Sequence, residues 1–305
     1  MVTFLQRTFT SLVHAHAGRT QVGEADRHYA ALRSGSLPKA LGRLRSFNVV
    51  EVVYKYMPFR EEFFENRWLR FTPRLYLNDP FEVRPSFSQH AEYAHKVNGY
   101  GESVKSVIEE MERNQYLVLK GMAIQDFDIY GILSLTERND NLLMWAHYAE
   151  SHTGMVIGLD PSHDFFDGTK SEKEYVRSAV NEHIGVLKKV KYSAKRKVKA
   201  DDLNEYFFLK SNDWWTEREH RYVLPIAEAD EIKKKDEREV MAFYQVPSEA
   251  ITSVIFGLKC PDQKVRGTVG FLKLRKEYKH VKLYKAKMCN ESYDLKIDSM
   301  VLAQT

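Results

Sequence analysis

The chain has few cysteines, no long apolar run and little net charge, and each absence narrows its class. Only two of its 305 residues are cysteines, Cys260 and Cys289, so neither a disulfide framework nor a structural zinc site is expected. No segment approaches the roughly 18–20 apolar residues that span a bilayer. Arg and His interrupt the apolar residues of the N-terminus, which makes it a poor signal peptide. We expect a soluble, cytoplasmic protein without a membrane partner. A net charge of +4, from 46 Lys and Arg against 42 Asp and Glu, does not by itself indicate nucleic-acid binding.

Several familiar catalytic motifs are absent as well. There is no GxGxxG after a strand, no GxxxxGKS/T, no GxSxG and no HExxH, which argues against dinucleotide-fold, P-loop, α/β-hydrolase and zincin chemistry. His147 and His152 lie five residues apart rather than four, which departs from the spacing of zinc-binding histidines on one helix face. No metal is therefore expected.

What is present predicts one main α+β domain. Residues 1–48 are polar and interrupted by Gly, Ser and Pro, which predicts a helical or partly ordered extension. Residues 49–290 are expected to form a mixed, mostly antiparallel central sheet with flanking helices, and residues 291–305 a C-terminal tail. Alternating apolar residues predict strands, and an apolar period near 3.6 predicts helices. The expected strands lie near 49–56, 68–72, 130–137, 155–160, 186–192, 221–227, 239–246, 251–257 and 281–287, and the expected helices near 59–66, 101–117, 140–151, 201–214 and 263–277.

The first of three polar motifs combines YKY at 54–56, on the expected first strand, with NDPFE at 78–82. Pro80 holds Asp79 out of the helical region, and Asn and Asp side chains bond readily to neighbouring backbone groups. The second segment is then either an ordinary Asx-type turn or a turn that directs Asn78 and Asp79 into a cleft beside Lys55.

The second motif is LLMWAHYA at 142–149, on a helix that Asn139 or Asp140 can cap. Positions 142, 146 and 149 share one helix face, which predicts the buried stripe and leaves His147 able to line a groove. Trp145 and Tyr148 are either core aromatic residues or platforms on which a ligand stacks.

The third motif is KSNDWWTEREHR at 210–221, and Lys210 lies on the apolar stripe of the expected helix 201–214. If the chain is extended after Trp215, then Glu217, Glu219 and Arg221 project from one face. Repulsion raises the pKa of one carboxyl, while Arg221 stabilises the charged form of the other. The pair then suits a general base or a carboxylate that orients a hydroxyl group. The alternative is a solvated row of ion pairs on an edge strand.

Taken together, YKY, LRFTPRLYLNDPFE, ILSLTERNDNLLMWAHYAESHTGMVIGLD and KSNDWWTEREHR resemble the bacterial family called domain of unknown function 2971, over roughly residues 50–290. Met57 stands where the family often has Arg, and His220 where it usually has Trp. The positions that match the family's pattern are Lys55, Tyr56, Asn78, Asp79, Trp145, His147, Tyr148, Lys210, Trp214, Glu217, Glu219 and Arg221.

The order of these motifs is loosely similar to that of ADP-ribosyltransferase-like folds, although the Ser-Thr-Ser phrase of many such enzymes is missing. The resemblance implies NAD as cofactor, a protein or nucleic-acid acceptor, and a role in defence, toxin action or stress response. It makes Glu219 the catalytic carboxylate, with Glu217, His147 and Tyr148 as further catalytic candidates, and lets Tyr148 or Trp145 stack on nicotinamide. The expected cofactor-binding residues are Lys55, Tyr56, Asn78, Asp79, Trp145, Lys210 and Arg221.

Two other classes remain open from the sequence. One is a non-catalytic nucleotide- or nucleic-acid-binding protein that uses the basic segment Lys188–Lys199. The other is a metal-independent nuclease that uses His147 and Glu219. The oligomeric state is also open.

Overall fold

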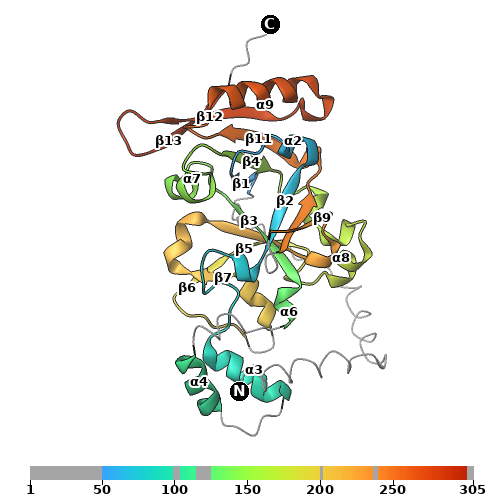
Figure 1. Ribbon diagram of the computed structural model, residues 1–305, viewed down its shortest axis with the longest axis vertical. Coiled ribbons are helices and arrows are strands. Elements are labelled where there is room, and N and C mark those ends of the chain that lie inside the picture. Colours follow the sequence, from blue (N-terminus) through green and yellow to red (C-terminus); the bar gives the residue numbers. More distant parts are fainter. Residues whose placement is uncertain (1–49, 99–103, 115–124, 200–201, 236–239, 301–305) are drawn as a thin grey trace, which may run out of the picture. The chain divides into compact units, whose positions relative to one another are not determined.

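The computed structural model describes residues 50–98, 104–114, 125–199, 202–235 and 240–300 (Figure 1). All of them belong to the unit Val49–Thr305. The predicted extension 1–48 lies outside the described residues. Within the described part, no helix has the length and apolar character that crossing a membrane requires.

A large mixed sheet dominates the described residues, as predicted for an α+β protein. The strands run in the order β13-β12-β11-β4-β1-β3-β2-β10-β9, and β8 joins β3 to β5 beside this path. Among the described strands of this sheet, only β11 and β12 pair in parallel, and the other pairs are antiparallel. Its strands are β1 (Val53–Met57), β2 (Trp68–Pro73), β3 (Tyr130–Thr136), β4 (Met155–Leu159), β5 (Leu187–Lys189), β8 (Glu219–Pro225), β9 (Glu231–Lys234), β10 (Val240–Gln245), β11 (Ile251–Phe256), β12 (Lys282–Met288) and β13 (Leu295–Ser299).

Helices and short 3₁₀ turns surround the sheet, and β6 (Lys191–Ser193) and β7 (Leu209–Ser211) form a separate parallel pair. The α-helices are α2 (Phe63–Asn66), α3 (Phe87–Asn98), α4 (Val104–Arg113), α6 (Gln125–Asp128), α7 (Leu142–Tyr148), α8 (Glu174–Ala179) and α9 (Asp262–Leu274). The 3₁₀ turns are η1 (Arg74–Tyr76), η2 (Asp164–Phe166), η3 (Gly168–Lys170), η4 (Leu203–Phe208), η5 (Asn212–Glu217), η6 (Ile226–Glu228), η7 (Ser248–Ala250) and η8 (Lys276–Tyr278).

Helices α7 and α9 cover opposite faces of the sheet. On β4, Met155 and Ile157 belong to the main core with α9, whereas Val156 between them packs with α7. This alternation follows from the two-residue period of a strand. All five residues of β4 are buried, because both of its faces are covered.

The buried face of α7 differs from the predicted one. Of the predicted stripe, Ala149 is buried, but Leu142 and Ala146 are exposed, and the helix buries Met144 and Trp145 instead. The larger apolar area of these two side chains outweighs that of the predicted stripe. The cap is Asn141 rather than residue 139 or 140, because its side chain accepts hydrogen bonds from the backbone N–H groups of residues 143 and 144.

The predicted helix over 201–214 is wrong. The chain forms η4, then β7, then η5, so Lys210 lies on a strand instead of a helix stripe. Three consecutive side chains, Tyr206, Phe207 and Phe208, are all buried, which one helix face cannot achieve. The Ser211 side chain accepts from the backbone N–H of Asp213 and begins η5, and such local bonds compete with a continuous helix.

Two other segments depart from the expected pattern. The strand predicted at 186–192 is divided, because β5 pairs with β8 whereas β6 pairs with β7. The segment 291–305, expected as a tail, contains β13, which pairs with β12 over five residues. Leu295 of β13 is buried against the α7 side of the sheet, which gives this strand an apolar anchor.

Strand β3 is the element that gathers the polar motifs. It pairs with β1 and β2 near its two ends and with β8 along its whole length. This register places Ser134 opposite Arg221 and Thr136 opposite Glu219. The YKY part of the first motif, on β1, and the end of the third motif, on β8, therefore both lie on strands that pair with β3, although they are more than 150 residues apart in sequence.

Candidate functional site

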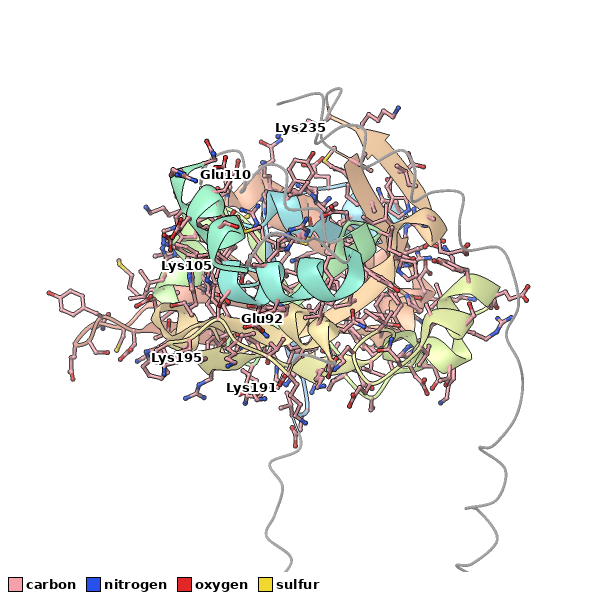
Figure 2. The ribbon with its side chains drawn as sticks, turned by 90° about the horizontal axis from the view of Figure 1, so that it is seen from below. Glu92, Lys105, Glu110, Lys191, Lys195 and Lys235 are labelled. Carbon is pink, nitrogen blue, oxygen red and sulfur yellow. The ribbon has the colours of Figure 1, made fainter. Side chains whose placement is uncertain are left out.

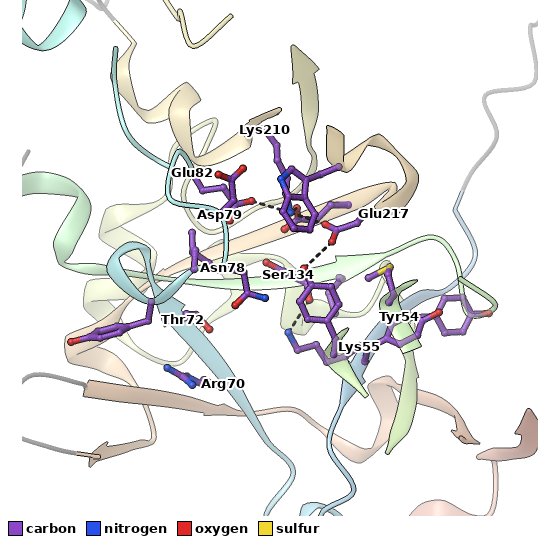
Figure 3. A pocket seen from close by; sticks show the side chains of 18 residues that line it. Tyr54, Lys55, Arg70, Thr72, Asn78, Asp79, Glu82, Ser134, Lys210 and Glu217 are labelled. Atoms are coloured by element: carbon purple, nitrogen blue, oxygen red, sulfur yellow. Dashed lines mark hydrogen bonds and ion pairs between the residues drawn. The ribbon is translucent and has the colours of Figure 1, made fainter. Parts of the chain in front are cut away.

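A cavity of about 220 Å³ collects residues from all three polar motifs. Lys55 comes from β1, Asn78 from the turn after η1, Tyr148 from α7 and Glu217 from η5. Figure 3 shows Lys55, Asn78 and Glu217 around one space. The full lining is Tyr54, Lys55, Tyr56, Arg70, Thr72, Tyr76, Leu77, Asn78, Asp79, Glu82, Ser134, Leu135, Met144, Tyr148, Lys210, Trp214, Glu217 and Glu219. We call this space the first cavity.

Lys210 is the centre of a buried ionic cluster beside the first cavity. Its Nζ lies 2.9 Å from a Glu82 carboxylate oxygen, 2.6 Å from Glu217 Oε2 and 2.9 Å from Glu219 Oε2. The same ammonium lies 4.9 Å from the centre of the Trp214 ring, within cation–π range. Burial lowers the pKa of Lys210, but Glu219 and Glu82 outweigh it and raise the pKa above its ordinary value.

Arg221 completes the cluster from β8 and is fully buried. Its Nε donates to Glu219 Oε1 at 2.7 Å, its Nη2 donates to Glu219 Oε2 at 3.0 Å and also to Glu82, and its Nη1 donates to the Phe207 carbonyl at 2.8 Å. A bidentate guanidinium–carboxylate pair of this kind fixes the geometry of both partners. The alternative of a solvated ion-pair row is thus excluded.

The two carboxyl groups of the third motif are in different electrostatic states. Burial acts to raise the pKa of Glu219, but Arg221 and Lys210 outweigh it and hold the pKa well below its ordinary value. Burial raises the pKa of Glu217, and Lys210 compensates only in part. The opposite shifts agree with the prediction from their spacing, although Glu217 lies on η5 rather than on the strand.

Tyr148 and Lys55 bound the cavity on its other sides. The Tyr148 hydroxyl donates to Glu217 Oε1 at 2.8 Å, and burial together with Glu217 raises the pKa of Tyr148. Lys55 Nζ donates to the Ser134 carbonyl at 3.0 Å. Burial lowers the pKa of Lys55 to about 8. An ammonium that loses its proton near neutral pH is a common feature of functional lysines.

The NDPFE segment is an Asx-type turn and also forms part of the cavity wall, so both interpretations of it apply. Asp79 Oδ1 accepts from the backbone N–H of Phe81 at 2.8 Å, which is the Asx-type bond. The turn also places Asn78, Asp79 and Glu82 in the wall of the first cavity. The following residue, Val83, has φ of +50°, an unfavourable conformation for a β-branched residue.

Three expected ligand-binding residues are largely inaccessible. Arg221 is fully buried and lines none of three cavities formed by the described residues, so it is corrected from a ligand-binding to a structural position. Trp145 is fully buried, makes an edge contact with Tyr56 and donates its indole N–H to the Asn139 carbonyl. Its ring has no free face, so the expectation that it stacks on nicotinamide is corrected. Tyr56 lines the first cavity but is buried, and its hydroxyl accepts a hydrogen bond from the backbone N–H of Asn141.

His147 and Glu219, paired in the nuclease hypothesis, are not brought together. His147 is exposed and lines a third cavity of about 430 Å³ with Tyr148, Trp214 and Glu217. Glu219 is buried and lines only the first cavity among those found in the described residues. The structure therefore offers no shared site for this pair.

Sequence reasoning missed several residues of the site, among them Glu82, Ser134 and Tyr192. Glu82 is the last letter of the NDPFE motif, but its link to the third motif is tertiary. Ser134 lies inside an apolar strand, and Tyr192 accepts the backbone N–H of Glu219 at 2.8 Å. For Ser134 and Tyr192, the sequence carries no signal that separates them from ordinary strand residues.

One group of possible metal ligands lies elsewhere. Glu182, His183 and Asp202 offer atoms within 4.8 Å of one another. His183 is already bonded to Asp202 at 2.7 Å, and the Lys188 ammonium lies 3.1 Å from its other ring nitrogen. A neighbouring cation disfavours a metal ion at this place.

The fold and the cluster thus define an α+β protein with a buried ionic site beside a polar cavity. Residues 144–222 match the family described as protein of unknown function, DUF2971. The match confirms, over this segment, the resemblance that the motifs predicted. It includes Tyr148, Lys210, Glu217 and Arg221. No curated protein and no solved structure matches the chain.

Proposed function

We propose that the protein is an enzyme that uses NAD as a substrate, breaks the bond between nicotinamide and ribose, and passes ADP-ribose to water or to a protein or nucleic-acid acceptor. The observation that carries the proposal is the pair Glu217 and Glu219, which share Lys210 beside a cavity and have pKa values shifted in opposite directions. Such a pair separates the roles of proton acceptor and fixed charge.

The chemistry needs negative charge near the ribose and a base near the acceptor. When the bond breaks, its electron pair leaves with the nicotinamide nitrogen, and C1′ of the ribose becomes electron-deficient. An oxygen nucleophile then bonds to C1′ and gives up its proton. The cluster contains three carboxyl groups, those of Glu82, Glu217 and Glu219, but only two cations, Lys210 and Arg221. The excess of carboxylates favours developing positive charge in a low-dielectric site.

Glu217, rather than Glu219, is the catalytic carboxylate in this proposal. Both oxygens of Glu219 are held by Arg221 and Lys210, and a carboxylate with a strongly lowered pKa is a weak base. Glu217 has a raised pKa and lines both the first and the third cavity. It can therefore take the proton of a nucleophile that arrives beside the ribose. Glu219 keeps Lys210 and Arg221 in place.

The remaining residues have binding roles. Tyr148 and the half-buried Trp214 line both cavities and offer rings for the nicotinamide, in place of Trp145. Lys55 and Asn78 line the first cavity and can bond to ribose hydroxyls. The wider third cavity, which His147 lines, is the side from which an acceptor would approach. A reaction that consumes NAD suits a cytoplasmic role in defence, toxin action or stress response.

The test is mass-spectrometric detection of free nicotinamide after the full chain is incubated with NAD and a cell lysate. Wild type and Glu65→Gln are expected to release nicotinamide, and Glu217→Gln is expected to release at least 100-fold less, within the range that a general base contributes. Glu65 is an exposed carboxylate on α2 and does not line the cavity, so its substitution is the matched control.

Parallel incubations with protein, RNA and DNA as acceptors decide between hydrolysis and transfer. A mass increase on one class of acceptor identifies it. If wild type releases no nicotinamide with any acceptor, the proposal is wrong. Equal release by wild type and Glu217→Gln would keep NAD as substrate but remove Glu217 from the mechanism.

A further inference from the structure

A second cavity of about 170 Å³ adjoins the first. The two share Asp79, Glu82 and Lys210 in their walls. The second cavity is smaller than the roughly 300–1,000 Å³ of pockets that enclose a whole drug-sized ligand. It therefore suits one part of a ligand whose remainder lies in the first cavity. Its other walls come from the segment after Asp79 and from residues 193–196 and 206–211.

The second cavity contains cations that form no ion pair with a described carboxylate. Arg84, Lys195 and Arg196 line it. Lys195 lies on the outer surface, on the same side of the molecule as Lys191 (Figure 2). Of the described carboxylates, none forms an ion pair with Arg84, Lys195 or Arg196. The guanidinium of Arg196 instead lies 4.9 Å from the centre of the Phe81 ring.

Arg84 has unused hydrogen-bonding capacity. Its Nε is buried and has no hydrogen-bond partner among the described residues. A buried donor without a partner costs free energy, and an incoming acceptor would recover it. Burial lowers the pKa of Arg84, and the neighbouring cations Arg74 and Arg196 lower it further, while Asp128 and Asp79 compensate only in part. Burial also lowers the pKa of Arg196. Repulsion among these cations would be relieved by an anion.

The acidic groups in the same wall neutralise these cations only in part, because Asp79 is the one that acts on both Arg84 and Arg196. Asp79 accepts the backbone N–H of Phe81, and Glu82 is held by Lys210 and Arg221. Val83, which has a positive φ, lies between Glu82 and Arg84. The Glu82 carboxylate belongs to the ionic cluster, whereas the Arg84 guanidinium lines the second cavity.

We propose that the second cavity binds the phosphate groups of the nucleotide whose ribose lies in the first cavity. This inference rests on the proposed function for the identity of the ribose, but not for the binding of phosphate. Arginine donors are matched to phosphate oxygens in geometry and charge. The substrate is then a phosphorylated nucleotide, and a nucleoside without phosphate is a poor substitute.

Calorimetric titration of the full chain with ADP and with adenosine tests the binding of phosphate without any reaction. Wild type is expected to bind ADP at least tenfold more tightly than adenosine. The double variant Arg84→Gln, Arg196→Gln is expected to lose most of this difference. Lys197→Gln removes a charge from an exposed neighbouring residue outside the cavity and is expected to keep it.

Equal affinity of wild type for ADP and adenosine, or no binding of either, overturns the inference. A short single-stranded RNA that binds more tightly than ADP, and loses affinity in the double variant, also overturns it, because the cavity would then serve a polymer backbone. Binding of ADP that depends on the two arginines, without release of nicotinamide from NAD, supports the phosphate site and refutes only the proposed reaction. Release of nicotinamide at the wild-type rate by the double variant at low NAD concentration refutes only the phosphate site.

Discussion

Replacing Glu219 by Gln and, separately, Glu217 by Gln is expected to change stability unequally, although the substitutions are identical and lie two residues apart. Glu219→Gln removes the negative charge that Arg221 and Lys210 share, and leaves these buried cations with Glu82 and Glu217 alone. Glu217→Gln removes a charge that burial already disfavours. The first substitution should therefore destabilise the fold strongly, and the second should not.

The magnitude follows from the burial of the partners. Removing one member of a buried ion pair typically costs about 3–5 kcal/mol, because the remaining charge stays buried without its partner. For a domain of this size, about 1 kcal/mol changes the melting temperature by roughly 2–4 °C. Glu219→Gln is thus expected to lower the melting temperature by roughly 6–20 °C. Glu217→Gln is expected to leave it unchanged or slightly higher at neutral pH.

The dependence on pH has opposite signs at the two positions. The folded-state pKa of Glu219 lies below its ordinary value of 4.5, so its contribution is present above pH 4.5 and is lost as the pH falls further. The difference between wild type and Glu219→Gln should therefore shrink below that pH. The folded-state pKa of Glu217 lies above 4.5. Its contribution to the free energy of unfolding is therefore present below that pH and is lost as the pH rises. The stability of Glu217→Gln relative to wild type should accordingly increase as the pH rises.

Thermal unfolding followed by circular dichroism, at pH 4, 5.5 and 7.5 for the three proteins, measures these differences. Glu65→Gln is the matched control and should unfold with wild type at each pH. Equal destabilisation by Glu217→Gln and Glu219→Gln at pH 7.5 would refute the electrostatic assignment.

Three further outcomes are expected. Because burial lowers the pKa of Lys55 to about 8, binding of ADP-ribose by its ammonium form should weaken as the pH rises through about 8, and calorimetry should show no such step for Lys55→Met. Tyr148→Phe removes a hydrogen bond that lowers the pKa of Glu217, so the acidic limb of the pH–rate profile should move to higher pH; an unmoved limb contradicts this role. Asn141→Ala removes the cap of α7 and a hydrogen bond to the Thr216 carbonyl, and should cost at least about 1 kcal/mol in urea unfolding; unchanged stability contradicts the role of this cap.

The sequence predicted most of the strands because their signal is local. Alternating or continuous apolar residues mark β1, β3, β4 and β11 close to their observed bounds. The errors fall where a local pattern allowed two structures. The segment 201–214 has apolar residues at helical spacing, but three adjacent buried rings and the pairing of Lys210 with β6 require a different path.

The residues of the candidate site were largely predictable, but their roles were not. Most of the predicted polar residues line the first cavity, as their motifs indicated; they are Lys55, Asn78, Asp79, Tyr148, Lys210, Glu217 and Glu219. Trp145 resembles a ligand-stacking residue equally well in the sequence, and only its burial excludes this. The ion pairs of Glu82 with Lys210 and Arg221 could not be predicted, because these partners lie more than 120 residues away along the chain.

The sequence by itself determined the α+β class, the resemblance to the family and the polar motifs, because periodicity, turn chemistry and residue type are properties of short segments. Only the tertiary structure decided which carboxylate is locked by Arg221 and which remains available beside Tyr148. It also decided that Arg84 and Arg196 share a cavity without a carboxylate partner among the described residues. Charge state and accessibility depend on burial and on partners distant in sequence, and neither is defined until the strands have paired.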